Sequence, residues 1–197
     1  MTPREIVYRA IEQRNPSRVP IYYFNRDHDC SDILAVSPVS ASDFREGRPG
    51  EAEWGYVWTT LDDTMGQPQQ PPLADWSRIS RFQPPDPWAP GRLDHINGTI
   101  ATEDRFIKCS LGITGFNQAT FLRGFEQFLD DLYTNPDHAD QVLDLVFDFE
   151  NGLIERLNQY AIDAISFSDD WGTQQGLIVS PDCWRQTFKP RYEAQFA

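Results

Sequence analysis

The sequence has no hydrophobic run long enough to cross a membrane and none of the motifs of the common nucleotide-binding or hydrolytic enzymes. A membrane-spanning helix needs about 20 apolar residues, and the charged, amphipathic start MTPREIVYRAIEQR is unlike a secretory signal. A P-loop, a G-x-G-x-x-G fingerprint, a G-x-S-x-G elbow and an H-E-x-x-H motif are all missing. We therefore expect no membrane partner, no export and no nucleotide-dependent chemistry.

Basic residues and cysteines are also scarce. The chain has 17 Lys and Arg against 30 Asp and Glu, which gives a formal net charge of -13. Such a charge repels phosphate backbones unless a local basic patch exists, and the scattered basic residues form none, so we expect no nucleic-acid partner. The three cysteines, Cys30, Cys109 and Cys183, are odd in number and far apart. This spacing favours a reducing compartment, and we predict a cytoplasmic protein.

What the chain does contain is an alternation of strand-like and helix-like segments within one predicted domain, residues 1–197. Thr2, Pro3 and Glu5 form a capping box that predicts a helix. Short runs rich in β-branched and aromatic residues predict strands at Arg18–Phe24, Arg105–Ile113 and Ala161–Phe167. Apolar residues at helical spacing predict helices over 121–132, from Pro136 to Leu157, and after Ser180. This order is typical of an α/β fold built from parallel βα units.

The segment 37–97 differs from the rest in its richness in Pro, Gly, Asp and Trp. Its one convincing strand-like piece is EWGYVWTTL, and its many aromatic side chains argue against a flexible linker because such side chains favour burial. We predict an ordered insertion that carries a hairpin.

Polar segments follow the three predicted strands, at Asn25–Asp32, Gly112–Gln118 and Ser168–Gln174. In parallel α/β folds, the residues just past the carboxyl ends of strands face the ligand site. These segments are therefore where the sequence predicts chemistry. The last of them, SDDWGTQ, places two acids directly after an apolar run.

Asp169 and Asp170 are the predicted catalytic residues. Carboxylates in this position could accept hydrogen bonds from a ligand, act as a general acid–base pair or orient a metal-bound group. The alternative is that they only form a turn or cap a helix, for which Asp is well suited. Because neighbouring side chains project differently, we expect at most one of the two to enter a cavity.

Five further residues are predicted to contact the substrate. Arg26 could hold a carboxylate through a bidentate contact, or it could be a surface arginine. The polar or aromatic side chains of the others suit ligand contacts: Asn25, Gln118, Trp171 and Gln174. His28 and Cys30 have a spacing that can chelate zinc, but no nearby residue completes the set of about three ligands. We predict no metal and no cofactor in this chain.

Several segments together resemble the uroporphyrinogen decarboxylase superfamily. They are TPREIVYRAIEQRNPSRVPIYY, EWGYVW, PLADWSRISRFQPPDPWAPGR, FLRGFEQFLDDLYTNPDHADQVLDLV and DAISFSDDWGTQQGLIVSPDCWRQTFKPRY. The likeness extends from end to end of the chain, and the last block is the most specific. The superfamily contains haem-pathway decarboxylases and zinc-dependent methyltransferases that act on corrinoids. The resemblance implies a TIM-type (β/α)8 barrel, of which this chain would form the N-terminal portion, with three or four βα units plus the insertion.

The chain departs from the motifs of both branches. The decarboxylases carry an Arg-Gln-x-Gly-Arg-Tyr motif after the first strand, where this chain has FNRDHDCSD and keeps only Arg26. The methyltransferases carry a His-x-Cys-Gly zinc motif beyond the point that corresponds to Ala197. HDCS at His28 is in the wrong place and lacks the glycine. The resemblance therefore implies zinc only for a full-length relative.

The resemblance leaves three hypotheses about function. The first is decarboxylation of a porphyrinogen in tetrapyrrole metabolism, and the second is methyl transfer to or from a corrinoid. Both imply a small-molecule partner, either a tetrapyrrole or a methyl donor. The third is an inactive half-barrel that exists as a fragment, a homodimer or another self-associated form, because an open parallel sheet leaves an unpaired edge.

Overall fold

The computed structural model describes residues 1–23, 30–60 and 65–197, which form two compact units. Unit 1 comprises residues 1–42, 88–112 and 154–168, and unit 2 comprises residues 43–87, 113–153 and 169–197. Asn25, Arg26 and His28 lie outside the described residues.

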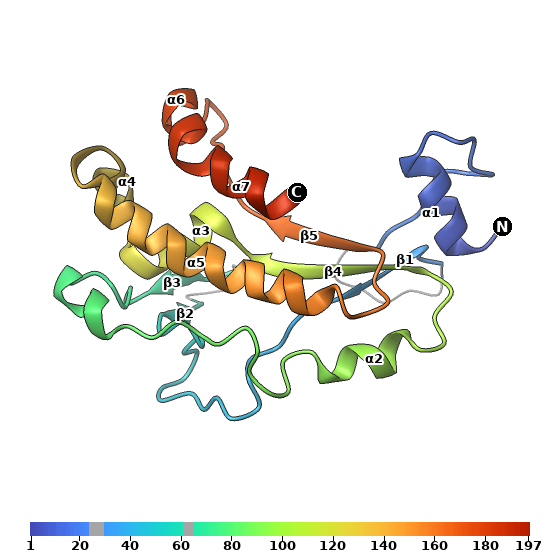
Figure 1. The fold of residues 1–197 in the computed structure, drawn as a ribbon, viewed down its shortest axis with the longest axis horizontal. Helices are drawn as coiled ribbons and strands as arrows, with labels where there is room; N and C mark the ends of the chain where they lie inside the picture. The colour runs from blue at the N-terminus through green and yellow to red at the C-terminus, as the bar shows by residue number, and fades with distance from the viewer. Residues whose placement is uncertain (24–29, 61–64) are drawn as a thin grey trace. The chain divides into compact units, whose positions relative to one another are not determined.

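Unit 1 is built on a three-stranded sheet with the strand order β1-β4-β5. Strand β1 (Ile33–Val36) pairs in parallel with β4 (Phe106–Ile113), with Leu34 opposite Ile107. Strand β5 (Ala164–Ser168) lies on the other side of β4 and runs in the same direction (Figure 1). The predicted strand at 105–113 is therefore confirmed, and the strand predicted at 161–167 is confirmed from Ala164 onward.

One hydrophobic core stabilises this sheet. Its buried members come from the strands, from helix α2 (Asp94–Ile100) and from the end of helix α5 (Pro136–Leu157): Leu34, Val36, Leu93, Ile96, Ile100, Ile107, Cys109 and Leu157. Ile107 and Cys109 have no exposed surface, and burial raises the pKa of the Cys109 thiol to about 12. A thiol held neutral in this way behaves as a small apolar side chain.

A half-buried carboxylate, Asp163, connects the N-terminal helix to the sheet. Helix α1 (Pro3–Ile11) begins as predicted, with the Thr2 hydroxyl accepting the Glu5 N–H. Its Tyr8 hydroxyl donates to Asp163 at 2.9 Å, and its Arg4 guanidinium lies 3.1 Å from the same carboxylate. Asp163 also accepts the Ile107 N–H at 2.7 Å. One side chain just before β5 thus holds α1 and β4 together.

The predicted strand over Arg18–Phe24 is wrong for its described part, residues 18–23. The Arg18 guanidinium instead binds the buried Asp32 carboxylate, with contacts of 2.5 and 2.6 Å. This ion pair lowers the pKa of Asp32, and the Ile21 N–H donates to the same carboxylate. The edge of the sheet is formed by Ile33–Val36, which we did not predict as a strand.

Unit 2 contains the hairpin and most of the helices. Strand β2 (Val57–Thr59) pairs antiparallel with β3 (Gln67–Gln69), and a 3-10 helix, η1 (Trp76–Arg81), follows. The remaining helical segments are α3 (Gly115–Arg123), α4 (Phe125–Thr134), α5, α6 (Pro181–Cys183), η2 (Trp184–Phe188) and α7 (Lys189–Phe196). Their apolar faces enclose a second core that includes Phe116, Leu122, Phe128, Leu143 and Phe188, each with no exposed surface.

Two helix boundaries differ from the prediction. The segment TGFNQ is not a turn, because helix α3 begins within it at Gly115, a residue with a positive φ of 49°. Gly124, with a φ of 95°, then divides the expected helix at 121–132 into α3 and α4. The helix predicted after Ser180 is confirmed, and it contains a π-helical turn over Trp184–Phe188. Pro190 follows this turn, and its missing N–H prevents a regular α-helical hydrogen bond.

No helix in the described part of the chain is long and apolar enough to span a membrane. The described strands form one three-stranded and one two-stranded sheet. The structure is thus α/β with parallel strands, while the partial (β/α)8 barrel and the single-domain organisation remain predictions.

Candidate functional site after strand β5

Asp169, the first residue after β5, closes the N-terminus of helix α3. Its carboxylate accepts the N–H of Phe116 at 3.0 Å and of Asn117 at 2.9 Å. The helix has no cap from its own N-cap residue, Thr114. The first N–H groups of a helix have no acceptor within the helix, and the positive end of the helix dipole lies beside them, so this is an energetically favourable place for a carboxylate. Asp169 therefore acts as a helix cap supplied from a distant part of the sequence.

A second acid, the buried Glu150 of helix α5, completes the cap. Its Oε1 accepts the Gly115 N–H at 2.7 Å, and its Oε2 accepts from the Gln195 side chain at 2.8 Å. Glu150 is 3% exposed. Burial, together with the charge of Asp169, raises the pKa of Glu150 to about 7, although its two hydrogen bonds oppose the shift. The carboxyl group is therefore close to half-protonated near neutral pH.

Tyr192 of helix α7 is the third side chain of this cluster. Its hydroxyl donates to Asp169 Oδ2. Burial raises the pKa of Tyr192, and the Asp169 charge raises it further. Burial also raises the pKa of Asp169, against the effect of its hydrogen bonds from Tyr192, Asn117 and Phe116. The hydroxyl thus stays protonated and serves as a donor.

The cluster is tightly packed around Gly115. A Cβ atom at this position would overlap the Tyr192 hydroxyl and the Asp169 carboxylate. The positive φ of Gly115 independently favours glycine. The cluster of Gly115, Glu150, Asp169, Tyr192 and Gln195 is therefore a filled interior network, which we call the acid cap.

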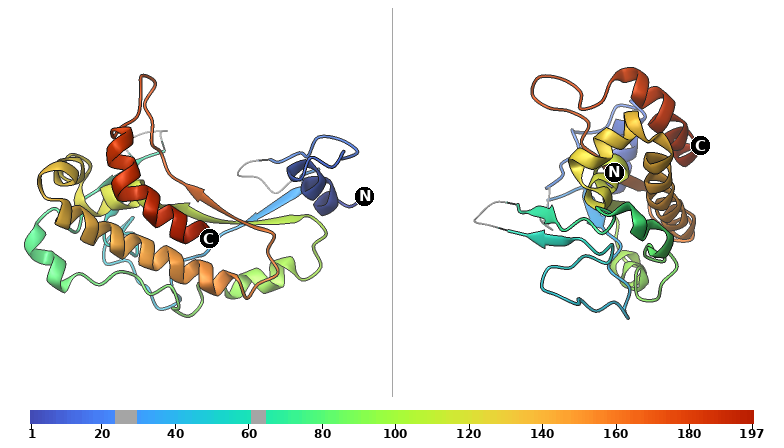
Figure 2. Two further views of the ribbon diagram at one scale, coloured as in Figure 1. Left: turned by 45° about the horizontal axis from the view of Figure 1, so that its top comes forward. Right: turned by 90° about the vertical axis from the view of Figure 1, so that its left-hand side faces the viewer.

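Helix α7 lies beside the unit 2 part of helix α5 (Figure 2). Besides the two acid-cap contacts, Arg191 binds Asp140 at 3.1 Å and Asp144 at 2.7 Å. The Tyr192 ring packs edge-on against Phe147, with ring centroids 5.2 Å apart. The acid cap therefore joins three helices, α3, α5 and α7.

Trp171 belongs to the wall of the hydrophobic core. Its ring centroid lies 4.8 Å from that of Phe116 and 4.6 Å from that of Phe188. The side chain is half-buried. Trp171 therefore covers the start of α3, and only the remaining part of its surface is accessible to a ligand.

Asp170 and Gln174 are exposed. Among the side-chain hydrogen bonds of the described residues, the Asp170 carboxylate takes part in one, which it accepts from the Gly172 N–H at 3.5 Å. Gln174 lies in a turn in which the Thr173 hydroxyl donates to the Gly176 carbonyl at 3.1 Å. Of the two predicted catalytic acids, Asp170 is the one that a ligand can reach, while Asp169 is occupied by α3 and Tyr192.

Gln118 is buried inside α3, with 4% of its surface exposed. Its Nε2 has no acceptor of hydrogen-bond geometry among the described residues. Burial raises the pKa of Tyr56, and a side-chain hydrogen bond with Gln118 offsets part of this rise. Gln118 therefore faces the interior near Tyr56, and the predicted ligand contact remains a prediction.

The described residues include no group of three or more His, Cys, Asp or Glu that could hold a metal ion. This part of the chain thus does not by itself fit the zinc centre of the methyltransferase branch. The predicted residues Asn25 and Arg26 lie outside the described residues, as does His28.

Glu150, Tyr192 and Gln195 were not predicted from the sequence as site residues. A signal for Glu150 was present, because Leu143, Val146, Glu150, Leu153 and Leu157 follow a spacing of three and four residues. An acid in the apolar stripe of a helix indicates a buried carboxylate with specific partners. Tyr192 and Gln195 carry no comparable signal in the sequence.

No protein-family model matches the chain, and no curated protein matches it. Among solved structures, the chain is similar to a methyltransferase from Methanosarcina mazei, with a TM-score of 0.41 and 21% sequence identity. The match covers 53% of this chain and 30% of the methyltransferase.

Proposed function

We propose that this chain is the N-terminal part of an enzyme of the uroporphyrinogen decarboxylase superfamily, and that the enzyme belongs to the methyl-transferring branch. The resemblance of the residue blocks quoted above supports the superfamily. The choice of branch rests on the electrostatics of the residues that follow β5. In this proposal Asp170 and Gln174 contact the ligand, and Asp169 positions the start of α3.

The supporting observation is that the two acids of the acid cap are stabilised by neutral groups. Asp169 and Glu150 receive hydrogen bonds from backbone N–H groups, the Tyr192 hydroxyl and the Gln195 amide. Asp170 adds a third, exposed carboxylate. A porphyrinogen with many carboxylates requires cationic side chains, and a cluster of acids would repel it. A methyl donor of lower negative charge suits this surface better.

The distinguishing experiment offers both substrates to a full-length form of the enzyme, because the zinc motif of the methyltransferase branch lies outside this chain. Methylcobalamin with a thiol acceptor tests methyl transfer, followed by the change in corrinoid absorbance, and uroporphyrinogen tests decarboxylation, followed by chromatography of the products. We expect methyl transfer and no loss of carboxyl groups. Asp170→Asn should reduce the methyl-transfer rate by about tenfold or more without a change in melting temperature. Decarboxylation of uroporphyrinogen, or full activity in Asp170→Asn, would contradict the proposal.

The alternative of a self-associating, inactive fragment also has an observation in its favour. The strand order β1-β4-β5 places β5 at an edge of the described sheet, and four of its five residues are half-buried. Edge strands are templates for pairing with another chain. Light scattering on the 22.7 kDa chain should then report a dimer or a larger species. A monomer that remains soluble across the concentration range would remove this alternative.

A further inference from the structure

Helix η1 in unit 2 borders a cleft of about 570 Å³ that none of the preceding functions uses. Its lining residues are Pro72, Asp75, Ser77, Arg78, Arg81 and Phe82. We propose that this cleft binds a small organic anion, one in which a phosphate or carboxylate group is attached to an apolar ring.

The geometry of a 3-10 helix places the charged side chains of the cleft in one row. Such a helix has three residues per turn, so side chains at positions i and i+3 are eclipsed. Asp75, the N-cap residue, is followed at this spacing by Arg78 and Arg81. All three line the cleft, which gives it two positive charges and one negative charge. This local excess of positive charge contrasts with the net charge of -13 for the whole chain.

The carboxylate in the row is already used by the helix itself. Asp75 accepts the Ser77 N–H at 3.0 Å and the Ser77 hydroxyl at 2.8 Å, and these hydrogen bonds lower the pKa of Asp75. The Arg78 guanidinium reaches it only at 4.0 Å. Arg78 therefore has most of its donors available to a ligand.

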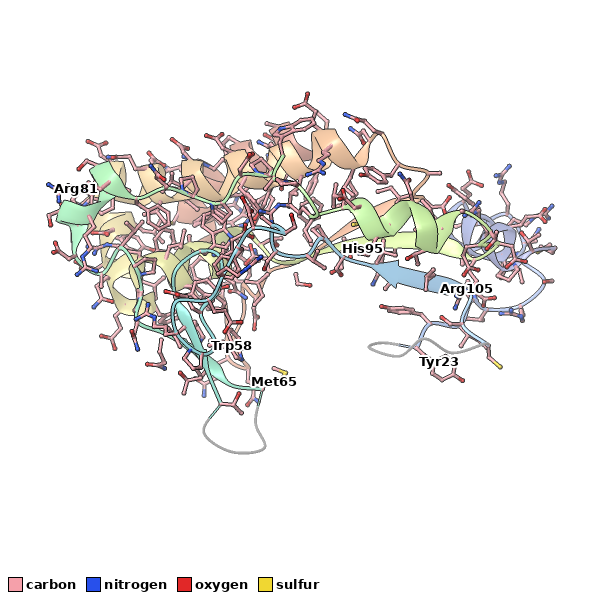
Figure 3. The ribbon with its side chains drawn as sticks, turned by 90° about the horizontal axis from the view of Figure 1, so that it is seen from below. Tyr23, Trp58, Met65, Arg81, His95 and Arg105 are labelled. Atoms are coloured by element: carbon pink, nitrogen blue, oxygen red, sulfur yellow. The ribbon has the colours of Figure 1, made fainter. Side chains whose placement is uncertain are left out.

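Arg81 makes no ion pair with any described carboxylate, and its side chain is exposed. Figure 3 shows it at the outer edge of η1. Two neighbouring guanidinium groups with available donors suit the planar geometry of a carboxylate or the oxygens of a phosphate.

Several contacts hold the cleft residues and their neighbours against the rest of unit 2. The Arg123 guanidinium donates to the carbonyls of Leu73 and Ala74, each at 2.8 Å. The Trp76 ring stacks on His138 with ring centroids 3.9 Å apart. Phe82, which lines the cleft, also packs against the hydrophobic core. The apolar surfaces of Pro72 and Phe82 therefore stay in place beside the arginines, which favours a ligand with a ring.

Binding of phenyl phosphate to the 197-residue protein tests this proposal. Because exposed ion pairs are weak, we expect a dissociation constant of about 1–10 mM at low salt. Inorganic phosphate should bind more weakly and benzyl alcohol should not bind, while added salt should weaken binding. The backbone amide signals of Ser77 and Phe82 should shift in two-dimensional NMR during the titration.

The variant Arg78→Gln/Arg81→Gln should weaken binding by about tenfold or more. The matched control is Arg9→Gln/Arg14→Gln, which removes the same charge from two exposed arginines that pair with Glu5 and Glu12. The control should bind as the unaltered protein does. Three results would overturn the proposal: no shift at Ser77 and Phe82, equal loss of binding in both variants, or equal binding of benzyl alcohol.

Discussion

Asp169→Ala is expected to lower the free energy of unfolding by about 4 kcal/mol, whereas Asp170→Ala should change it by less than about 0.5 kcal/mol. The two residues are adjacent, but their surroundings differ. Removal of the Asp169 carboxylate leaves the N–H groups of Phe116 and Asn117 without their acceptor, along with the Tyr192 hydroxyl. Each buried donor left without a partner costs about 1–3 kcal/mol. Asp170 is exposed and has little to lose.

Urea denaturation of the two variants measures this difference. We expect a large decrease in the midpoint for Asp169→Ala at an unchanged slope, because the native contacts change more than the surface exposed on unfolding. The midpoint of Asp169→Asn should lie between those of the two alanine variants. The amide of asparagine keeps one oxygen acceptor, but its NH₂ group faces side chains and N–H groups that are themselves donors. Equal midpoints for Asp169→Ala and Asp170→Ala would show that the acid cap does not stabilise the protein.

Glu150→Gln is expected to stabilise the protein at pH 8 by about 3 kcal/mol. The folded-state pKa of Glu150, about 7, lies above its ordinary value of 4.5 because the carboxyl group is buried. A raised pKa means that the folded state prefers the protonated form. The stability from this preference is fully present below about pH 4.5 and is lost as the pH rises to about 7. Glutamine stays neutral, so the variant avoids this loss.

The substitution also preserves the hydrogen bonds. The amide oxygen can accept the Gly115 N–H as Oε1 does. Once the Gln195 amide, which now donates to Glu150 Oε2, turns over, the new amide nitrogen can donate to Gln195 Oε1, a buried atom without a partner among the described residues. Unfolding curves at pH 5 and pH 8 provide the test. The two proteins should be similar at pH 5 and differ at pH 8. The control is Glu155→Gln, which changes an exposed acid of the same helix. A variant that is less stable than the unaltered protein at pH 8 would contradict this account.

The sequence was sufficient to predict most of the regular elements. Caps and proline positions predicted the starts of α1, α5 and α6, and apolar runs predicted β4 and β5. These signals are local, so a single segment carries them. The strand predicted over residues 18–24 failed because its apolar composition resembles a strand, whereas its conformation is set by the ion pair between Arg18 and Asp32.

The candidate site was less predictable, because it depends on contacts between residues that are distant in the sequence. The segment SDDWGTQ was recognisable because two acids follow a strand, but its chemistry depends on residues far away in the sequence. Asp169 binds the start of α3, some 50 residues earlier, and Tyr192, 23 residues later. No local pattern indicates such partners. The division between a structural Asp169 and an accessible Asp170 therefore emerges only from the structure.

The central claim is that the Asp169 and Glu150 carboxylates of the acid cap hold helices α3, α5 and α7 together, which leaves Asp170 as the acid available to a ligand. The most direct measurement is an NMR titration of the Glu150 side-chain carboxyl carbon in the folded protein. The acid cap predicts a midpoint near pH 7 and a lower midpoint in Asp169→Asn, because the Asp169 charge contributes to the shift. A midpoint near the ordinary value of 4.5, unchanged in Asp169→Asn, would contradict the account.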